Sequence, residues 1–160
     1  MDYHYTMQVC MNGHVTEERM EERTCEVDYC EECGAKAICE CPTCGTPIKG
    51  EERFDGIVAI GFEAEPPKYC YKCGDPFPWT KASLEALEEL AQLDDLLDEN
   101  DVKDLSVSAK EIMSETPKTK VAAIKFKKIL SRAGSETATA ARELFVDIVA
   151  ETAKRTIWPS

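Results

Sequence analysis

The hydrophobic pattern divides the chain into a first part without helical periodicity and a second part with it. Before residue 80, apolar residues stand in short runs broken by turn-forming residues, which is typical of strands and turns. After residue 80, leucine, isoleucine, phenylalanine and alanine recur every three or four positions, as on the buried face of an amphipathic helix. The pattern therefore predicts a small β domain over residues 1–79, followed by an all-α domain over residues 80–160.

The periodicity of the second part predicts four helices, over about residues 80–97, 102–113, 117–133 and 135–157. The third has the clearest ends, because Thr116 is placed to cap its first turn and Pro117 suits the first helical position. Gly134 is predicted to end this helix in the left-handed conformation. Its predicted buried face consists of Ala122, Phe126, Ile129, Leu130 and Ala133.

The cysteines carry the strongest chemical pattern in the sequence. All nine lie before residue 74, and six of them form three Cys-x-x-Cys pairs, each followed directly by glycine. A two-residue gap lets a tight turn direct both thiolates at one ion, and the glycine allows the backbone conformation of that turn. A Cys-x-x-x-His pair precedes them. The candidate metal ligands are Cys10, His14, Cys30, Cys33, Cys41, Cys44, Cys70 and Cys73.

Eight ligands fill two tetrahedral sites, which predicts two Zn2+ ions per chain. If the ligand pairs combine sequentially, the first and second pairs hold one ion and the third and fourth hold the other, as tandem zinc ribbons. Crossed pairing, as in RING domains, would join the first pair with the third and the second with the fourth. Residues 34–40 separate the second and third pairs, and this long spacing favours the sequential arrangement. Cys25 and Cys39 are interpreted as small packing residues, although Cys39 is near enough to Cys41 to replace it as a ligand.

Both predicted sites are closed by four protein ligands, whereas a catalytic zinc keeps one position for water. The sequence also contains no glycine-rich phosphate loop and no nucleophile elbow. We therefore expect a non-enzymatic protein. The first residues lack the basic start and apolar run of a secretory signal, and metal-binding thiols suit a reducing compartment, so a cytoplasmic location is expected.

The net charge of −12 opposes diffuse attraction to nucleic acid or to an anionic membrane. Charge is also segregated: residues 85–104 contain nine acidic residues and one lysine, whereas residues 116–134 contain five lysines, one arginine and no acid. One interpretation is that the basic helix packs beside the acidic helix after Thr80, within the chain or across a dimer. The alternative is that the basic helix binds nucleic acid. The candidate partner-binding residues are Trp79, Lys125, Lys128 and Arg132, and Trp79 is either an exposed anchor or a plug between the two domains.

Two segments carry a resemblance to a known family. Residues 5–14 read YTMQVCMNGH and residues 69–80 read YCYKCGDPFPWT. They resemble an uncharacterised bacterial family of zinc-ribbon proteins, and residues 115–119, 126–128 and 151–154 are similar to its helical tail. The resemblance implies a bacterial, cytoplasmic, zinc-binding protein without naming its role.

The sequence therefore predicts a non-enzymatic zinc-ribbon adaptor that binds a protein partner, either another protein or a second copy of itself. A nucleic-acid-binding zinc-ribbon protein that uses the basic helix 117–133 is the alternative. A membrane role is disfavoured because Glu143, Asp147 and Glu151 run along the last predicted helix and would oppose anionic lipid.

Overall fold

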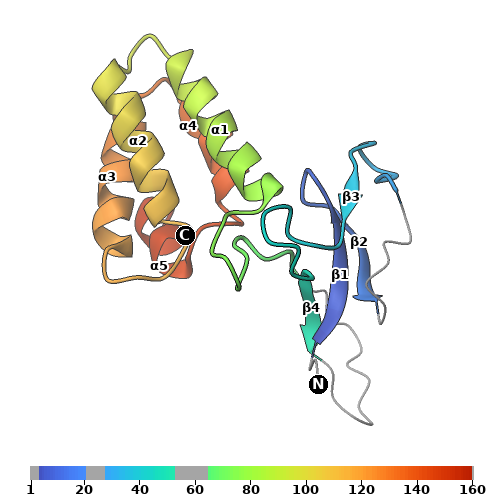
Figure 1. Cartoon of the computed structure of the whole chain (residues 1–160). Helices are drawn as coiled ribbons and strands as arrows, with labels where there is room; N and C mark the ends of the chain where they lie inside the picture. The colour runs from blue at the N-terminus through green and yellow to red at the C-terminus, as the bar shows by residue number, and fades with distance from the viewer. Residues whose placement is uncertain (1–3, 21–27, 53–64, 160) are drawn as a thin grey trace. The chain divides into compact units, whose positions relative to one another are not determined.

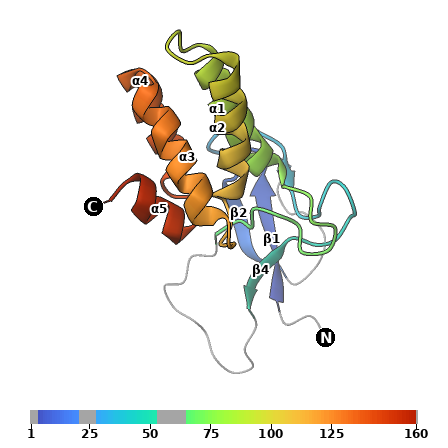
Figure 2. The ribbon, with the colours of Figure 1, turned by 90° about the vertical axis from the view of Figure 1, so that its left-hand side faces the viewer.

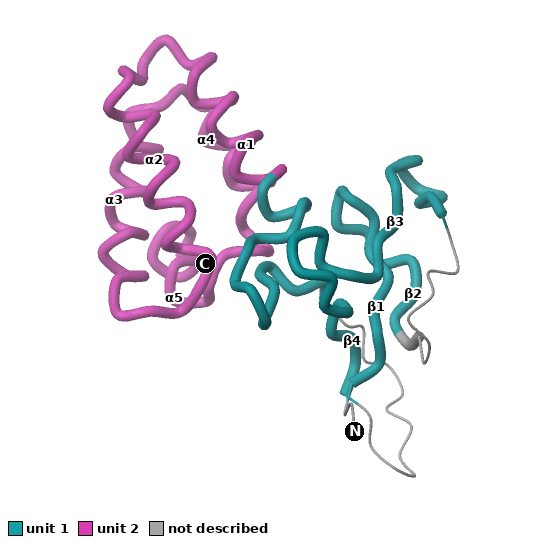
Figure 3. Tube along the Cα trace, in the orientation of Figure 1, with its two compact units in different colours: residues 1–81 teal, residues 82–160 magenta. Residues whose placement is uncertain are grey.

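The computed structural model describes residues 4–20, 28–52 and 65–159, and its chain divides into two compact units (Figure 3). Unit 1 comprises residues 1–81 and unit 2 comprises residues 82–160. The division falls two residues after the boundary expected from the hydrophobic pattern. A small antiparallel sheet in unit 1 is followed by five helices.

Unit 1 is built around β1 (His4–Cys10), the central strand of a four-stranded antiparallel sheet (Figure 1). β2 (Val15–Met20) pairs with one edge of β1. The other edge is shared, because β3 (Ala37–Ile38) pairs with the end of β1 and β4 (Lys49–Glu52) pairs with its start. With both edges paired, the last four residues of β1 are buried. Cys10, the last residue of the central strand, is therefore buried and held in place by the sheet.

The core of unit 1 is small and includes two of the candidate ligands. Phe77 and Trp79 stack within it, with ring centroids 4.7 Å apart. The Trp79 indole donates a hydrogen bond to the Pro67 carbonyl at 2.9 Å, which satisfies its only polar group. The buried residues of this core are Met7, Val9, Cys41, Ile48, Cys70, Phe77 and Trp79.

Unit 2 is helical, with α3 packed against α2, α4 and α5 (Figures 1 and 2). The predicted buried face of α3 is confirmed for Ala122, Phe126, Ile129 and Leu130, which are all buried. Phe126 is fully buried, and its ring lies 6.2 Å from Phe145 and 6.3 Å from Trp158. The helices are α1 (Pro78–Gln92), which crosses the unit boundary, α2 (Glu99–Glu111), α3 (Thr119–Arg132), α4 (Ser135–Phe145) and α5 (Glu151–Ile157).

The prediction of one helix over residues 135–157 is wrong, because the segment forms two helices. The backbone N–H of Ala150 donates to the Ile112 carbonyl at 2.8 Å, and the N–H of Thr152 donates to the Glu115 carboxylate at 2.9 Å. These bonds hold the start of α5 against the segment after α2, so α4 and α5 do not form one continuous helix. In the described residues, no helix is both long and apolar enough to cross a bilayer.

The prediction for Gly134 is also wrong. Its φ of −65° and ψ of 156° are extended, not left-handed, and it stands at the N-cap of α4. Its N–H donates to the Asp94 carboxylate at 2.8 Å, so a contact from 40 residues away fixes its conformation. Positive φ among the described glycines is confined to Gly13, Gly34, Gly45 and Gly74, which all belong to the cysteine segments of unit 1.

Candidate metal centres

The three Cys-x-x-Cys-Gly segments fold into the same turn, which we call the knuckle. In the last knuckle, the Gly74 N–H donates to the Cys70 carbonyl and the Cys70 N–H donates to the Asp75 carbonyl, both at 2.9 Å. Gly74 has φ +79°, which an L side chain disfavours. The same two backbone bonds and a similar glycine φ recur in the knuckles that begin at Cys30 and Cys41. In each knuckle the first cysteine is buried and the second is exposed.

The first cluster joins the end of β1 to the first knuckle. Cys10 ends β1, and His14 follows a turn through Gly13, whose φ is +93°. The Cys10 Sγ lies 3.7 Å from the Cys33 Sγ. The His14 Nδ1 lies 3.5 Å from the Cys10 Sγ and 3.7 Å from the Cys30 Sγ. The ring nitrogen nearest the chain therefore faces the thiols.

The other nitrogen of His14 faces an acidic side chain. Its Nε2 lies 3.7 Å from the Glu32 Oε2, which is ion-pair distance but beyond a direct hydrogen bond. A carboxylate next to the second nitrogen of a ligating histidine favours the tautomer that leaves the first nitrogen free to bind a metal. Asn12 adds a further contact, because its side-chain amide donates to the Cys33 Sγ at 3.4 Å.

The second cluster joins the two remaining knuckles. The Cys41 Sγ lies 3.7 Å from the Cys73 Sγ, and the Cys44 Sγ lies 3.7 Å from the Cys70 Sγ. The Lys72 N–H donates to the Cys70 Sγ at 3.4 Å. The four thiols thus form a compact set with backbone support from the knuckle.

The structure brings together all eight predicted ligands in the sequential pairing. Within each cluster the donor atoms lie within 4.8 Å of one another, so both groups could hold a metal ion. One group consists of Cys10, His14, Cys30 and Cys33, and the other of Cys41, Cys44, Cys70 and Cys73.

A model of a bacterial protein family matches residues 3–157, a span that contains both clusters and all five helices. The family is described as an uncharacterized protein conserved in bacteria, DUF2321. The chain belongs to this family. The match confirms the resemblance to an uncharacterised bacterial family. Searches of curated proteins and of solved structures found no match.

The pKa values of the thiols diverge within each cluster of this family member. Hydrogen bonds with the Thr46 side chain and backbone lower the pKa of Cys44 to about 6. In the same cluster, the Asp75 backbone bond lowers the pKa of Cys73, but burial and the three neighbouring thiols outweigh it and raise that pKa to about 12. In the first cluster, bonds from the Ala35 backbone and the Asn12 side chain lower the pKa of Cys33 to about 6.

This divergence has a physical cause. Several thiolates within a few ångströms repel one another, so ionisation of one thiol disfavours ionisation of the next. A divalent cation at the centre of the cluster would remove that repulsion and let all the thiols ionise together. The acid–base properties of both clusters therefore fit a metal site.

Cys39 and His4 belong to neither cluster. Cys39 is buried in unit 1 and does not replace Cys41, but it is disulfide-bonded rather than a free packing thiol as the sequence suggested. Cys25 lies outside the described residues. The His4 Nδ1 lies 3.3 Å from the Gly50 carbonyl in the strand pair β1–β4.

The predicted partner-binding residues have different environments. Trp79 is only 8% exposed and packs inside the core of unit 1, so it does not form an exposed anchor. A Cβ at Gly13 would lie 3.0 Å from the Trp79 Cβ, which shows how closely the indole covers the first cluster's turn. Lys125 and Lys128 are exposed on α3, whereas Arg132 forms an ion pair with Asp101 of α2. The described acidic partner of α3 is therefore α2, not α1 as the sequence suggested.

Proposed function

We propose that the protein is a non-enzymatic adaptor in which two Zn2+ ions fold unit 1 as tandem zinc ribbons and unit 2 binds a protein partner. The observation that carries the zinc part is the spacing of the donor atoms in the two clusters.

Zinc accounts for this spacing quantitatively. A tetrahedral ion with Zn–S bonds of about 2.3 Å requires sulfur atoms about 3.8 Å apart, and a Zn–N bond of about 2.0 Å brings sulfur and nitrogen to about 3.5 Å. One sulfur pair in the first cluster and two in the second lie 3.7 Å apart, and the His14 Nδ1 lies 3.5 and 3.7 Å from two sulfurs. Thiolate and imidazole ligands also suit zinc better than magnesium or calcium, which prefer oxygen.

A structural role for the metal follows from the ligand count and from the size of the core. Each cluster supplies four donors, which leaves no coordination position for a catalytic water. Among the described residues of unit 1, the hydrophobic core cluster contains seven buried residues, and two of these, Cys41 and Cys70, are proposed ligands. Small domains with so little buried apolar surface depend on a metal or a disulfide for their stability.

The state of the cluster thiols supports metal binding. All seven cysteines of the two clusters are free thiols, whereas Cys39, which belongs to neither cluster, is disulfide-bonded. The cluster thiols are therefore available as zinc ligands.

The surface of α3 supports binding to a protein. Val121 and Ile124 are 56% and 42% exposed, and they lie on one stripe with Lys125 and Lys128 at three- and four-residue spacing. Exposed apolar side chains that are rimmed by polar residues mark interaction sites on protein surfaces. This stripe carries no aromatic residue for base stacking, and the whole chain has a net charge of −12.

One observation favours the alternative, a nucleic-acid-binding role. Among the described residues, five of the six cations of the basic segment have no ion-pair partner, since only Arg132 forms one. Unpaired lysines on one helix attract phosphate as well as carboxylate. The two roles therefore need a direct experimental comparison.

The zinc part is tested by native mass spectrometry of protein purified without chelator. We expect two zinc ions in the natural protein, and fewer in Cys33→Ser and in Cys73→Ser, because each substitution removes one ligand from a different cluster. Thr43→Ser, which lies between Cys41 and Cys44 without belonging to the ligand set, is the matched control and keeps two. Two zinc ions in both cysteine variants would contradict the assignment.

The partner part is tested by chromatography of the zinc-loaded protein on heparin and by chemical cross-linking in cells. We expect no salt-dependent retention on heparin, and cross-links from unit 2 to protein. Retention that is lost when Lys125 and Lys128 are both replaced by glutamine would instead support nucleic-acid binding.

A further inference from the structure

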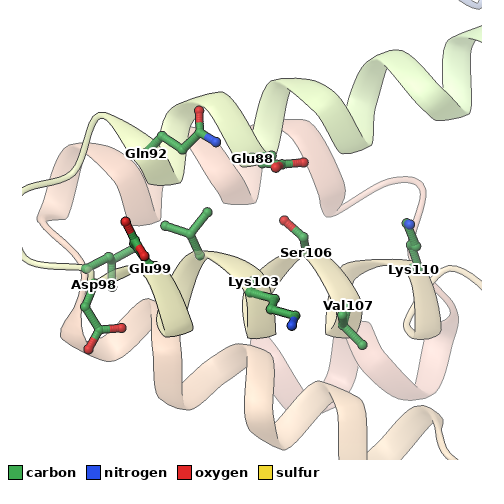
Figure 4. Close-up of a pocket in the computed structure, with 10 residues that line it drawn as sticks. Glu88, Gln92, Asp98, Glu99, Lys103, Ser106, Val107 and Lys110 are labelled. Carbon is green, nitrogen blue, oxygen red and sulfur yellow. The ribbon is translucent and has the colours of Figure 1, made fainter.

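Unit 2 contains a groove between α1 and α2, with a volume of about 520 Å³ (Figure 4). Leu97, Val102 and Val107 provide its apolar lining. The hydroxyl of Ser106 points from α2 toward α1, is buried, and has no hydrogen-bond partner among the described residues.

The groove is acidic at its edges. Glu88, Asp98 and Glu99 line it, opposed by Lys103 and Lys110. The exposed acids Glu85, Glu89 and Asp95 lie in the same helix and turn, so the wider rim is negative. An incoming surface should therefore be both apolar and cationic.

The exposed apolar residues of unit 2 gather at only two places. Leu93 and Leu96 are 81% and 66% exposed, and they stand between Gln92 and Leu97, which both line the groove. Val107, 52% exposed, also lines the groove. The other two large exposed apolar residues in the described part of unit 2 are Val121 and Ile124 on α3.

Val121 and Ile124 belong to a surface with the opposite charge. We define the α3 stripe as Val121, Ile124, Lys125 and Lys128, which lie on one face of the helix at three- and four-residue spacing. Neither lysine has an ion-pair partner among the described residues. The stripe thus has the apolar and cationic character that the groove requires.

We propose that the α3 stripe of one copy of this chain docks into the α1–α2 groove of a second copy. This inference deepens the proposed function, because it identifies the protein partner of unit 2 as the chain itself. Val121 and Ile124 cover the apolar lining and the exposed leucines at the end of the groove, while Lys125 and Lys128 approach the acidic rim. Burying all five exposed apolar residues of unit 2 drives the association, and the charges fix its orientation.

The positions of the two surfaces favour a closed dimer. Val107 lines the α1–α2 groove and also a smaller hollow between α2 and α3, which Lys125 and Lys128 line as well. The groove and the α3 stripe are therefore neighbours on either side of α2. Adjacent complementary surfaces let two copies related by a two-fold axis make both contacts at once, which ends the assembly at two chains.

Sedimentation equilibrium of the full zinc-loaded chain tests this proposal. We expect a dimer of the 17.9 kDa chain that dissociates more readily at high salt. The stripe variant Lys125→Glu/Lys128→Glu and the groove variant Glu88→Lys/Glu99→Lys should each weaken the dimer by about a hundredfold or more, because each places like charges in contact.

Two further samples separate docking from a general charge effect. The control Lys81→Glu/Arg142→Glu makes the same charge change as the stripe variant at exposed residues outside both surfaces, and it should dimerise as the natural chain does. An equimolar mixture of the stripe variant and the groove variant should form a heterodimer, because the reversed stripe matches the reversed groove and the natural stripe matches the natural groove.

Each outcome decides the proposal. A natural chain that is monomeric at all concentrations, a dimer that the stripe variant leaves intact, or a mixture without heterodimer would overturn self-docking. If the natural chain is monomeric but cross-links to a different protein through unit 2, the adaptor function stands and only the identity of its partner is wrong. A dimer that follows the expected pattern supports self-docking even if no other protein is found.

Discussion

The two units of this molecule use opposite means to hold a fold together. The described part of unit 1 has a hydrophobic cluster of seven buried residues beside a short sheet, and the thiols of its three knuckles, with Cys10 and His14, form two clusters. Unit 2 contains no candidate metal cluster in its described residues, and its helices pack around the fully buried Phe126. With zinc bound as proposed, unit 1 should depend on its metal, and unit 2 on the shape of its core.

The largest expected effect is the response to metal removal. A strong chelator should unfold unit 1 while unit 2 keeps its helices, because structural zinc contributes about 10–16 kcal/mol to the folding of zinc-finger peptides. Far-UV circular dichroism should retain most of its signal at 222 nm, since nearly all the helical residues lie in unit 2. Loss of the whole helical signal together with zinc would mean that the two units do not fold independently.

The converse change is Phe126→Ala. It removes a fully buried ring that contacts Phe145 and Trp158, so unit 2 should lose about 3–5 kcal/mol of unfolding free energy in urea. Zinc stoichiometry should stay at two. Val121→Ala, on the exposed face of the same helix, is the control and should change stability by less than about 0.5 kcal/mol. Release of zinc from the Phe126→Ala variant under native conditions would contradict the separation of the two units.

Lowering the pH should weaken zinc binding in unit 1. Zinc binding requires the Cys73 thiolate, whose pKa is raised to about 12, so the thiol holds its proton at pH 7 without metal and releases it on binding. The apparent zinc affinity should therefore fall about tenfold per pH unit for each proton released, as the pH is lowered. Competition with a chromophoric zinc indicator between pH 6 and 8 measures this slope. An affinity independent of pH would show that the thiolates are already formed in the metal-free protein.

The two units also differ in how much of them the sequence predicts. All eight members of the candidate metal clusters follow from local spacing: six belong to Cys-x-x-Cys-Gly segments, each of which specifies a turn within five residues, and Cys10 and His14 form a Cys-x-x-x-His pair. The buried face of α3 is equally local, since Ala122, Phe126 and Ile129 repeat with the helical period.

One error is local: α3 begins at Thr119 with Lys118 at its N-cap and no side-chain cap bond, so Thr116 and Pro117 do not hold the predicted positions. The other errors arise where the deciding contact is distant in sequence. The break between α4 and α5 depends on Ile112 and Glu115, and the extended conformation of Gly134 depends on Asp94. The burial of Trp79 depends on a carbonyl at Pro67 and on the turn at Gly13. The groove likewise could not be predicted from the pattern of one helix, because its walls belong to two helices. Periodicity records which residues are buried in an element, and not which other element covers them.

A smaller difference is expected between glycine-to-alanine substitutions in the two units, measured as their effect on stability. Gly74→Ala should destabilise unit 1 by about 1–2 kcal/mol, because the φ of +79° disfavours an L side chain although no atom lies within 4 Å of the added Cβ. Gly134→Ala is the matched control in unit 2, where φ is −65° and the nearest atom, the Asp94 Oδ2, is 3.5 Å away. It should be neutral or stabilise by up to about 1 kcal/mol. Zinc retention during chelator challenge reports on the first variant and urea unfolding on the second. If Gly74→Ala retained zinc as the natural protein does, the left-handed turn would not be what constrains the knuckle.

The smallest effect concerns the ion pair between α2 and α3. Arg132→Gln removes the partner of Asp101 and should lower the unfolding free energy of unit 2 by about 0.2–1 kcal/mol, because the arginine side chain is 58% exposed and screened by solvent. Lys128→Gln removes the same charge from the same helix without breaking an ion pair to a described residue, so its loss should be smaller. Urea unfolding of both variants at low and at 0.5 M salt measures the difference, which salt should reduce. If the difference persists unchanged at high salt, Arg132 stabilises unit 2 through the packing of its aliphatic stem rather than through its charge.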